Sequence, residues 1–136
     1  MNNITMTSMR DASLSAALRR QYHRARLAGL RLTDDEILRR AISSSVPDGY
    51  FVGLDHALKM VSAAIHHRLP SRLKPLRRLM WDEIAAKTTD RMRLTGERMI
   101  DSVTHVLSSS AASRYFISET SARRITRHIR RKEAAL

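Results

Sequence analysis

Six basic side chains lie close together near the C-terminus, and their types and spacing suggest a chemical role. They are Arg123, Arg124, Arg127, Arg130, Arg131 and Lys132. An arginine can donate two parallel hydrogen bonds to a phosphate group and can also stack on a base. Four of the six recur at intervals of three or four residues: Arg123, Arg127, Arg130 and Arg131. On a helix these four share roughly one face, which we expect to contact phosphate. The alternative is a solvated helix end, where cations favour the helix dipole.

Two further groups of basic residues occur earlier in the chain. One contains Arg19, Arg20, Arg24 and Arg26, and the other contains Arg68, Arg72, Lys74, Arg77 and Arg78. We expect Arg19, Arg20, Arg24, Arg77 and Arg78 to add to the phosphate-binding surface. Arg77 and Arg78 precede Trp81, and an aromatic ring beside arginines can stack bases in proteins that bind single strands. A lone tryptophan more often belongs to a core or an interface, and we prefer that interpretation for Trp81.

The sequence contains no recognisable catalytic or metal-binding group. His66 and His67 are adjacent, so on a helix they point to different sides, and no histidine has a partner at the spacing of zinc ligands. Asp82 and Glu83 diverge in the same way, whereas a general acid and a general base must converge. There is no Gly-x-Ser-x-Gly elbow, and the four glycines form no phosphate loop. We therefore expect no catalytic residue, no metal site and no cofactor, and predict that the protein is not an enzyme.

The overall charge is consistent with phosphate contacts. The 136 residues include 25 lysines and arginines against 13 aspartates and glutamates, which gives a net charge of +12. A domain this basic is a candidate for binding nucleic acid. Cysteine is absent, which excludes disulfides and thiolate metal sites. Without a long apolar run or a signal peptide, we expect a cytoplasmic protein with no membrane partner.

The apolar pattern predicts the elements that position these side chains. Apolar residues at helical spacing begin near Leu14, and Gly29 predicts the end of that helix. Thr33 and Glu36 form a capping box that starts a second helix. Its expected buried face is Ile37, Leu38, Ala41 and Ile42. After a loop, a third helix is expected at about 54–68.

The second half of the chain predicts one long helix and one basic helix. Apolar residues keep to one face from about 73–107, with Gly96 in that stripe, and the basic helix occupies about 118–134. Gly96 would either let another helix approach closely or weaken the helix locally. These elements predict an all-α protein with a single compact domain of about five helices at 13–136, after a polar tail at 1–12.

An aromatic motif occurs twice, just before two of the predicted helices. Tyr50-Phe51-Val52 is followed by Ala57, and Tyr115-Phe116-Ile117 is followed by Ala122. Ser118 and Gly53 suit the N-cap position, and the aliphatic residue before each cap can pack against the alanine as a hydrophobic staple. We expect the aromatic pairs to pin both helix entries to a common core. The similarity is either a structural repeat or a coincidence.

Two resemblances concern these motifs. The repeated Tyr-Phe-aliphatic-x4-Ala pattern, at 50–57 and 115–122, is similar to that of small uncharacterised bacterial helical proteins associated with phages and mobile elements. Separately, residues 117–125 resemble the recognition helix of helix-turn-helix proteins. That motif joins its helices by a short turn, whereas the longer segment 108–117 intervenes here. The first resemblance implies a bacterial, nucleic-acid-handling context and no activity.

Charge, motifs and the absence of catalytic groups lead to one expected function and one alternative. We expect a non-enzymatic protein that binds DNA or RNA through the phosphate backbone, as a regulator or as a basic subunit of a nucleoprotein complex. The alternative is a protein interaction or assembly subunit that docks an acidic partner or forms a homo-oligomer. A basic helix lying on a membrane is disfavoured because the stripe of Ala122, Ile125 and Ile129 is narrow.

Overall fold

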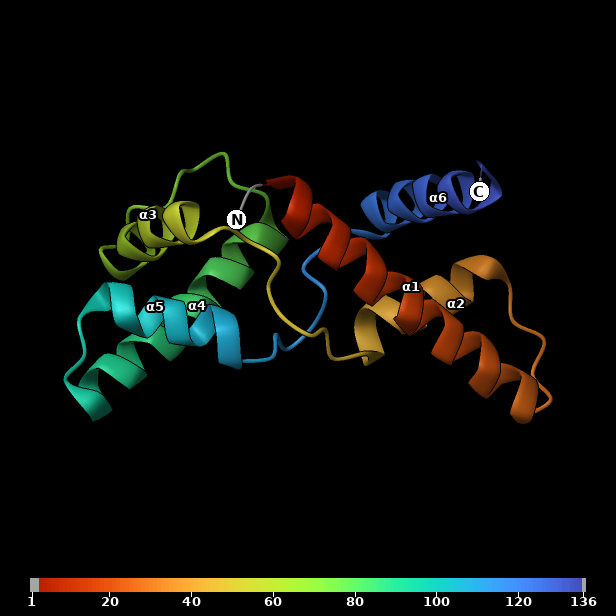
Figure 1. Cartoon of the computed structure of the whole chain (residues 1–136), viewed down its shortest axis with the longest axis horizontal. Coiled ribbons are helices and arrows are strands. Elements are labelled where there is room, and N and C mark those ends of the chain that lie inside the picture. The colour runs from red at the N-terminus through yellow and green to blue at the C-terminus, as the bar shows by residue number, and fades with distance from the viewer. Residues whose placement is uncertain (1–2, 136) are drawn as a thin grey trace.

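The computed structural model describes residues 3–135, which form six α-helices and no β-strand (Figure 1). In chain order these are α1 (Asn3–Leu27), α2 (Asp34–Ser44), α3 (Leu54–Ile65), α4 (Pro75–Thr95), α5 (Met99–Ser109) and α6 (Glu119–Ala135). The predicted all-α class is confirmed. Among these helices, none is both long and apolar enough to cross a lipid bilayer.

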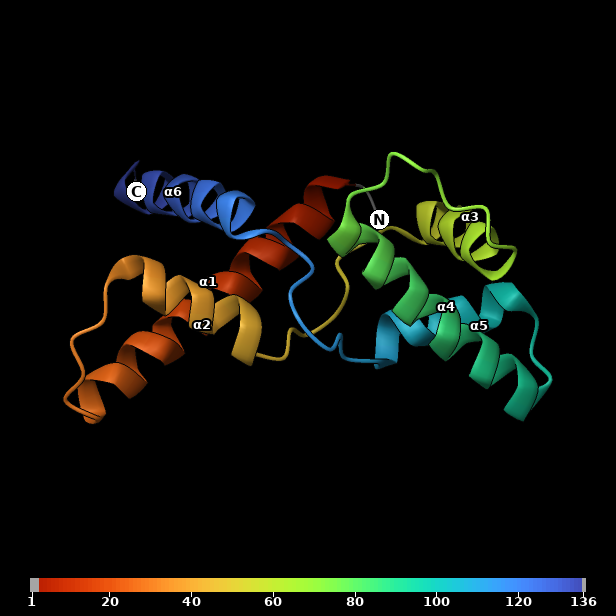
Figure 2. The ribbon, with the colours of Figure 1, turned by 180° about the vertical axis from the view of Figure 1, so that it is seen from behind.

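The helices form two groups of three, each around its own hydrophobic core (Figure 1 and Figure 2). We call α1, α2 and α6 the terminal lobe, and α3, α4 and α5 the central lobe. Among the described helices, every pair in contact belongs to one lobe. Leu14 and Ile37 lie at the centre of the terminal core, and Trp81 and Ile84 at the centre of the central core. The lobes must therefore be joined by segments outside the helices.

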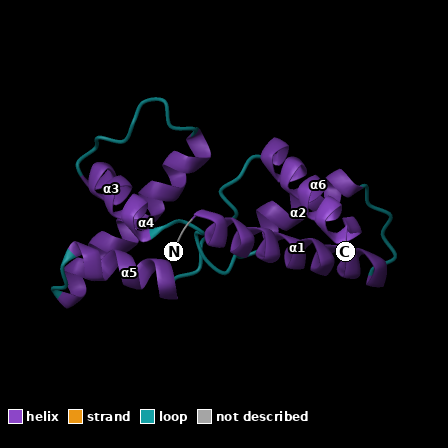
Figure 3. Cartoon of the chain, turned by 45° about the horizontal axis from the view of Figure 1, so that its top comes forward, coloured by secondary structure: helices purple, strands orange, loops and turns teal. Residues whose placement is uncertain are grey.

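Two linkers, residues 45–53 and 110–118, carry the chain between the lobes (Figure 3). Successive side chains of the aromatic motifs enter opposite cores. Tyr50, Val52 and Phe116 pack in the central core, whereas Phe51, Tyr115 and Ile117 pack in the terminal core. The prediction of one common core is wrong, because consecutive side chains of each motif enter different cores. Each linker consequently fastens both lobes together.

The two halves of the chain repeat one arrangement of helix, helix, linker and helix. α2 and α5 contain 11 residues each, and the two linkers are also equal in length. Gly29 and Gly96 follow α1 and α4 in the left-handed conformation, with φ of 68° and 72°. Each half contributes its third helix to the other lobe, since α3 packs on α4 and α5 while α6 packs on α1 and α2. The similar aromatic motifs thus belong to a structural repeat with exchanged third helices.

Two predicted element boundaries are wrong. The expected long helix at 73–107 is divided, because α4 ends at Thr95 and Gly96 turns the chain with its N–H donating to the carbonyl of Met92 at 2.9 Å. The expected polar tail at 1–12 is helical from Asn3 onward, and residues 1–2 lie outside the described residues. No glycine or proline interrupts 3–12, so the helix that packs through Leu14 extends back through this segment.

Several local predictions are confirmed. Thr33 Oγ1 accepts a hydrogen bond from the backbone N–H of Glu36 at 3.2 Å and so caps α2. The expected face of α2, Ile37, Leu38, Ala41 and Ile42, is buried. Ser118 Oγ accepts from the N–H of Ser121 at 3.1 Å at the start of α6. Trp81 is 1% exposed and belongs to the core, as preferred over a base-stacking role.

Candidate nucleic-acid interface

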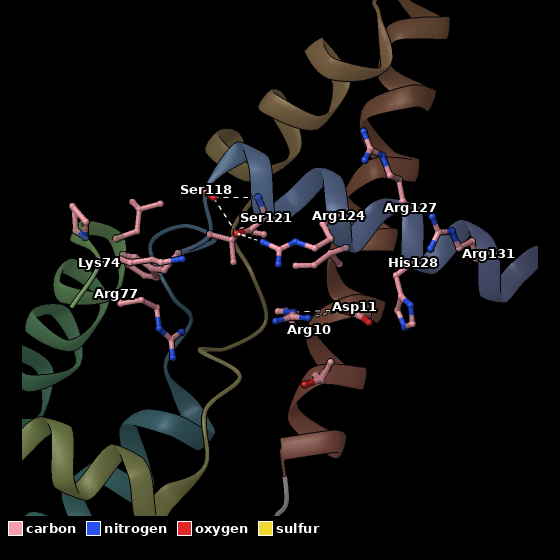
Figure 4. Close-up of a pocket in the computed structure, with 16 residues that line it drawn as sticks. Arg10, Asp11, Lys74, Arg77, Ser118, Ser121, Arg124, Arg127, His128 and Arg131 are labelled. Carbon is pink, nitrogen blue, oxygen red and sulfur yellow. Dashed lines mark hydrogen bonds and ion pairs between the residues drawn. The ribbon is translucent and has the colours of Figure 1, made fainter. Parts of the chain in front are cut away.

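A groove of about 1050 Å³ opens between the lobes where three helices meet. It is lined by the N-terminal parts of α1 and α4 and by one face of α6 (Figure 4). Apolar side chains from the second linker and from α6 form part of its surface, namely Phe116, Ile117 and Ile125. Both lobes therefore contribute to one concave surface, and the linkers set the distance across it.

Six lysine and arginine side chains line this groove. They are Arg10, Lys74, Arg77, Arg124, Arg127 and Arg131. Asp11 is the single carboxylate in the lining, and its Oδ1 lies 3.1 Å from Nη2 of Arg10. Within the described part of the chain, the other five basic residues form no ion pair. Cations gathered without counter-charges make the groove a favourable place for an anion.

The local sequence of α6 directs its arginines into the groove. Ser118 caps the helix, while Ile117 and Ala122 pack in the terminal core and fix the direction in which the helix leaves the linker. Ser121, Arg124 and Arg131 then lie on the face of α6 that lines the groove. Arg124 Nη2 also donates to Ser121 Oγ at 3.4 Å, which orients this guanidinium along the groove (Figure 4). Helix capping and apolar packing thus position the charges.

Arg77 of α4 is the partly buried cation among the lining residues that form no ion pair within residues 3–135. Its guanidinium carbon lies 5.9 Å from the centroid of the Trp81 ring, and its Nη1 makes only a weak contact of 3.8 Å with Met80 Sδ. Burial, and to a lesser extent the charge of Arg10, lowers the pKa of Arg77. The side chain remains charged because arginine starts from a very high pKa. Arg77 is therefore a partly desolvated cation that a bound anion would stabilise.

The predicted face of four arginines is divided by the structure. Arg123 Nε lies 3.1 Å from Asp35 Oδ1 and Arg130 Nη1 lies 3.8 Å from Asp34 Oδ2, so both point toward the first turn of α2. The charge of Asp35 raises the pKa of Arg123. Arg127 lies at the boundary and lines both the groove and a smaller cavity of about 210 Å³ beside this ionic seam. The sequence could not reveal this division, because the acidic partners come from a distant segment.

The remaining predicted residues lie elsewhere. Arg19, Arg20, Arg24 and Lys132 are exposed and do not line the groove. Arg78 Nη2 donates to the carbonyl of Pro70 at 2.7 Å and so holds the loop that precedes α4. Of the predicted set, the groove therefore brings together Arg77, Arg124, Arg127 and Arg131.

Arg10 is a groove residue that sequence reasoning missed, because it fell within the supposed tail. A signal was present in the sequence. Residues 24–29 read Arg-Ala-Arg-Leu-Ala-Gly and residues 91–96 read Arg-Met-Arg-Leu-Thr-Gly. When these two segments are aligned, α1 matches α4 and Arg10 is at the position equivalent to Arg77. The structure shows both arginines on the groove.

A second polar cluster joins both linkers to α4, away from the groove. Glu83 accepts hydrogen bonds from the Tyr50 hydroxyl at 2.7 Å and from the N–H of Ser113 at 3.1 Å, while Lys87 donates to the Tyr50 hydroxyl and to Ser110 Oγ at 2.6 and 2.8 Å. Burial, together with the bond to Glu83, raises the pKa of Tyr50. These groups satisfy one another, so we assign the cluster a structural role.

Over the described residues, no three histidine, aspartate or glutamate side chains gather as a metal site would require. Comparison of the chain with profiles of known protein families, with curated protein sequences and with solved structures found no significant match. The groove is consequently the feature from which a function can be inferred.

Proposed function

We propose that the protein binds nucleic acid through phosphate contacts in the groove and does so without catalysing a reaction. The observation that supports this most directly is the convergence of six basic side chains from three helices on one concave surface that contains a single, already paired carboxylate. Nucleic acids offer phosphates at regular intervals along a chain, which suits cations spread along a groove. The protein would act as a regulator or as a basic subunit of a nucleoprotein complex.

The separation of paired and unpaired arginines on α6 supports the same proposal. Arg123 and Arg130 already have carboxylate partners on α2 and hold the helix in place. Arg124 and Arg131 lack such partners within residues 3–135 and lie on the groove. A carboxylate paired with a cation offsets much of the attraction of that cation for a phosphate. The groove arginines are thus the ones available for binding.

Binding can be tested by fluorescence anisotropy with labelled duplex DNA, single-stranded DNA and structured RNA. We expect affinity to fall steeply with salt, with a log–log slope of about −0.9 per contact on duplex DNA and about −0.7 on single strands. Affinity that does not change between ~50 and ~200 mM salt would contradict phosphate contacts. Binding to none of the three near ~100 mM salt would contradict the proposal and favour an acidic protein partner.

A pair of triple variants locates the contacts. Arg124→Gln, Arg127→Gln and Arg131→Gln together remove charge from the groove, and we expect them to weaken binding and reduce the salt slope by about two to three contacts. The matched control is Arg26→Gln, Arg31→Gln and Arg93→Gln, which removes the same charge from exposed positions near the tips of the two helical hairpins. Equal losses in both variants would show that only the net charge matters.

A further inference from the structure

The groove has basic side chains on more than one side. Figure 4 shows Lys74, just before α4, and Arg77 of α4 on one side and Arg127 and Arg131 of α6 on the other, with Arg10 of α1 below them. Apolar side chains also line the groove: Leu76, Phe116, Ile117 and Ile125. The lining thus combines charged and apolar surface.

This shape suits one form of nucleic acid better than another. Proteins that read a duplex insert a protruding helix or strand into a groove of the DNA, whose major groove is about 12 Å wide. Here the cations line a depression in the protein, and two linkers anchored in both cores restrain its width. Phosphates on the outside of a duplex would meet the rim only. A single strand could enter, with phosphates on the arginines and bases against apolar side chains.

Arg77 is a cation of the groove that is partly buried. It lies on the Trp81 ring, is partly buried and has no carboxylate partner within the described residues. Arg10, at the equivalent position of the other half, is compensated by Asp11 through bonds of 3.1 and 3.3 Å. An anion that reached Arg77 would have to enter the groove, which favours a narrow single strand over a duplex.

We propose that the groove takes a single-stranded nucleic acid, DNA or RNA, with one phosphate bound by Lys74 and Arg77 and others by the α6 arginines. This inference rests on the proposed function and specifies its substrate. Phe116 contributes the aromatic ring in the lining, and Ile117 and Ile125 extend the apolar surface on which bases would lie. A free nucleotide carries the same phosphate chemistry, so the test includes it.

The experiment compares four probes on the full-length protein at ~100 mM salt: a labelled oligothymidine of about 16 nucleotides, an oligouridine of the same length, a blunt duplex containing the oligothymidine strand, and ATP as a competitor. We expect at least one single strand to bind about tenfold more tightly than the duplex, and ATP to compete only in large excess. A duplex bound equally or more tightly, with loss in the triple groove variant, would overturn this inference and leave the proposed function intact. No binding to any nucleic acid would overturn both.

The deciding variant is Arg77→Gln, with Arg26→Gln as the control for net charge. We expect Arg77→Gln to weaken single-strand binding by about tenfold or more, as for the loss of one hydrogen-bonded charge. Its thermal midpoint should equal or exceed that of the wild type, because an uncompensated and partly buried charge is removed. Unchanged single-strand binding in Arg77→Gln would overturn the inference. So would displacement of the oligonucleotide by ATP at equimolar concentration, which would assign the groove to free nucleotides.

Discussion

α3 and α6 occupy equivalent positions in the two halves of the chain, yet they are held by different forces. Each packs a fully buried alanine at its start, Ala57 in α3 and Ala122 in α6. α3 goes on to bury Met60 and Val61, whereas Ala122 is the only buried residue in the described part of α6. Instead, α6 is fastened by ion pairs to α2. Apolar packing therefore holds α3, whereas α6 combines a smaller apolar contact with partly exposed ion pairs.

This difference shows how one scaffold can serve both stability and binding. A helix that buries a wide apolar stripe cannot also present charges on that side. α3 gives its surface to the central core. α6 buries less and keeps Arg124, Arg127 and Arg131 free to line the groove. The third helix of one half thus completes a hydrophobic core, and the third helix of the other half also presents basic side chains to the groove.

The largest expected effect comes from separating the two halves. When residues 1–68 and 69–136 are made as separate chains, each lacks the third helix of its own lobe, which the other half supplies. We expect each fragment alone to be poorly folded, because the exposed core surfaces lose their cover. Mixing should restore helical structure in a one-to-one complex. Circular dichroism and size-exclusion chromatography can measure this, and two fragments that fold independently would contradict the exchange of third helices.

A smaller effect is expected from removing the central side chain of each core. Trp81→Ala and Leu14→Ala stand at equivalent positions and should each lower the free energy of unfolding, by about 3–5 and 2–5 kcal/mol respectively. Because the linkers fasten each lobe to the other, we expect both lobes to be affected in both variants. Urea unfolding followed by hydrogen exchange would show this. Leu79→Ala, at a position 55% exposed, is the control and should change stability little.

Acid should distinguish the two tyrosine anchors. The Tyr50 anchor bonds to charged Glu83, whereas the Tyr115 hydroxyl bonds to Ser13 Oγ at 2.6 Å. Burial alone would raise the pKa of Glu83, but hydrogen bonds from Ser113 and Tyr50 and the charge of Lys87 hold it below the ordinary value of 4.5. Its contribution to stability is therefore complete above pH 4.5 and is lost as the pH falls through the lowered pKa.

We expect hydrogen exchange to report opening of the central lobe around the Tyr50 anchor as the pH is lowered below 4.5. Glu83→Gln should lose the part of this pH dependence that comes from the cluster. Identical acid profiles for the wild type and the variant would refute a role for Glu83 in holding the linkers.

The smallest effect concerns the ionic seam. Arg123→Gln together with Arg130→Gln removes two partly exposed ion pairs, each contributing about 1 kcal/mol or less. We expect faster amide exchange in α6 and no change in α3. Raising the salt concentration should have the same selective effect in the wild type, since salt screens exposed charges. Equal protection of both helices at high salt would show that apolar contacts suffice for α6.

The predicted helix caps, which depend on neighbouring residues, are confirmed. The capping of α2 by Thr33 and of α6 by Ser118 depends on groups within a few positions of each other, and both bonds are present. The prediction of one long helix is wrong because the apolar periodicity continues on both sides of Gly96. The turn there depends on the backbone conformation that this one glycine adopts. The prediction of a polar tail is wrong because residues with weak apolar periodicity can still extend a helix that packs through later residues such as Leu14.

The sequence by itself determined the helical class, the strong positive charge, the caps and the two aromatic anchors, because each follows from composition or from residues close along the chain. Only the tertiary structure decided that the anchors divide between two cores and that Arg10 and Arg77 line one groove. It also decided that Arg123 and Arg130 are occupied by carboxylates of α2. Whether a charge is free or neutralised depends on which distant segment packs beside it, and the spacing of residues along one helix does not contain that information.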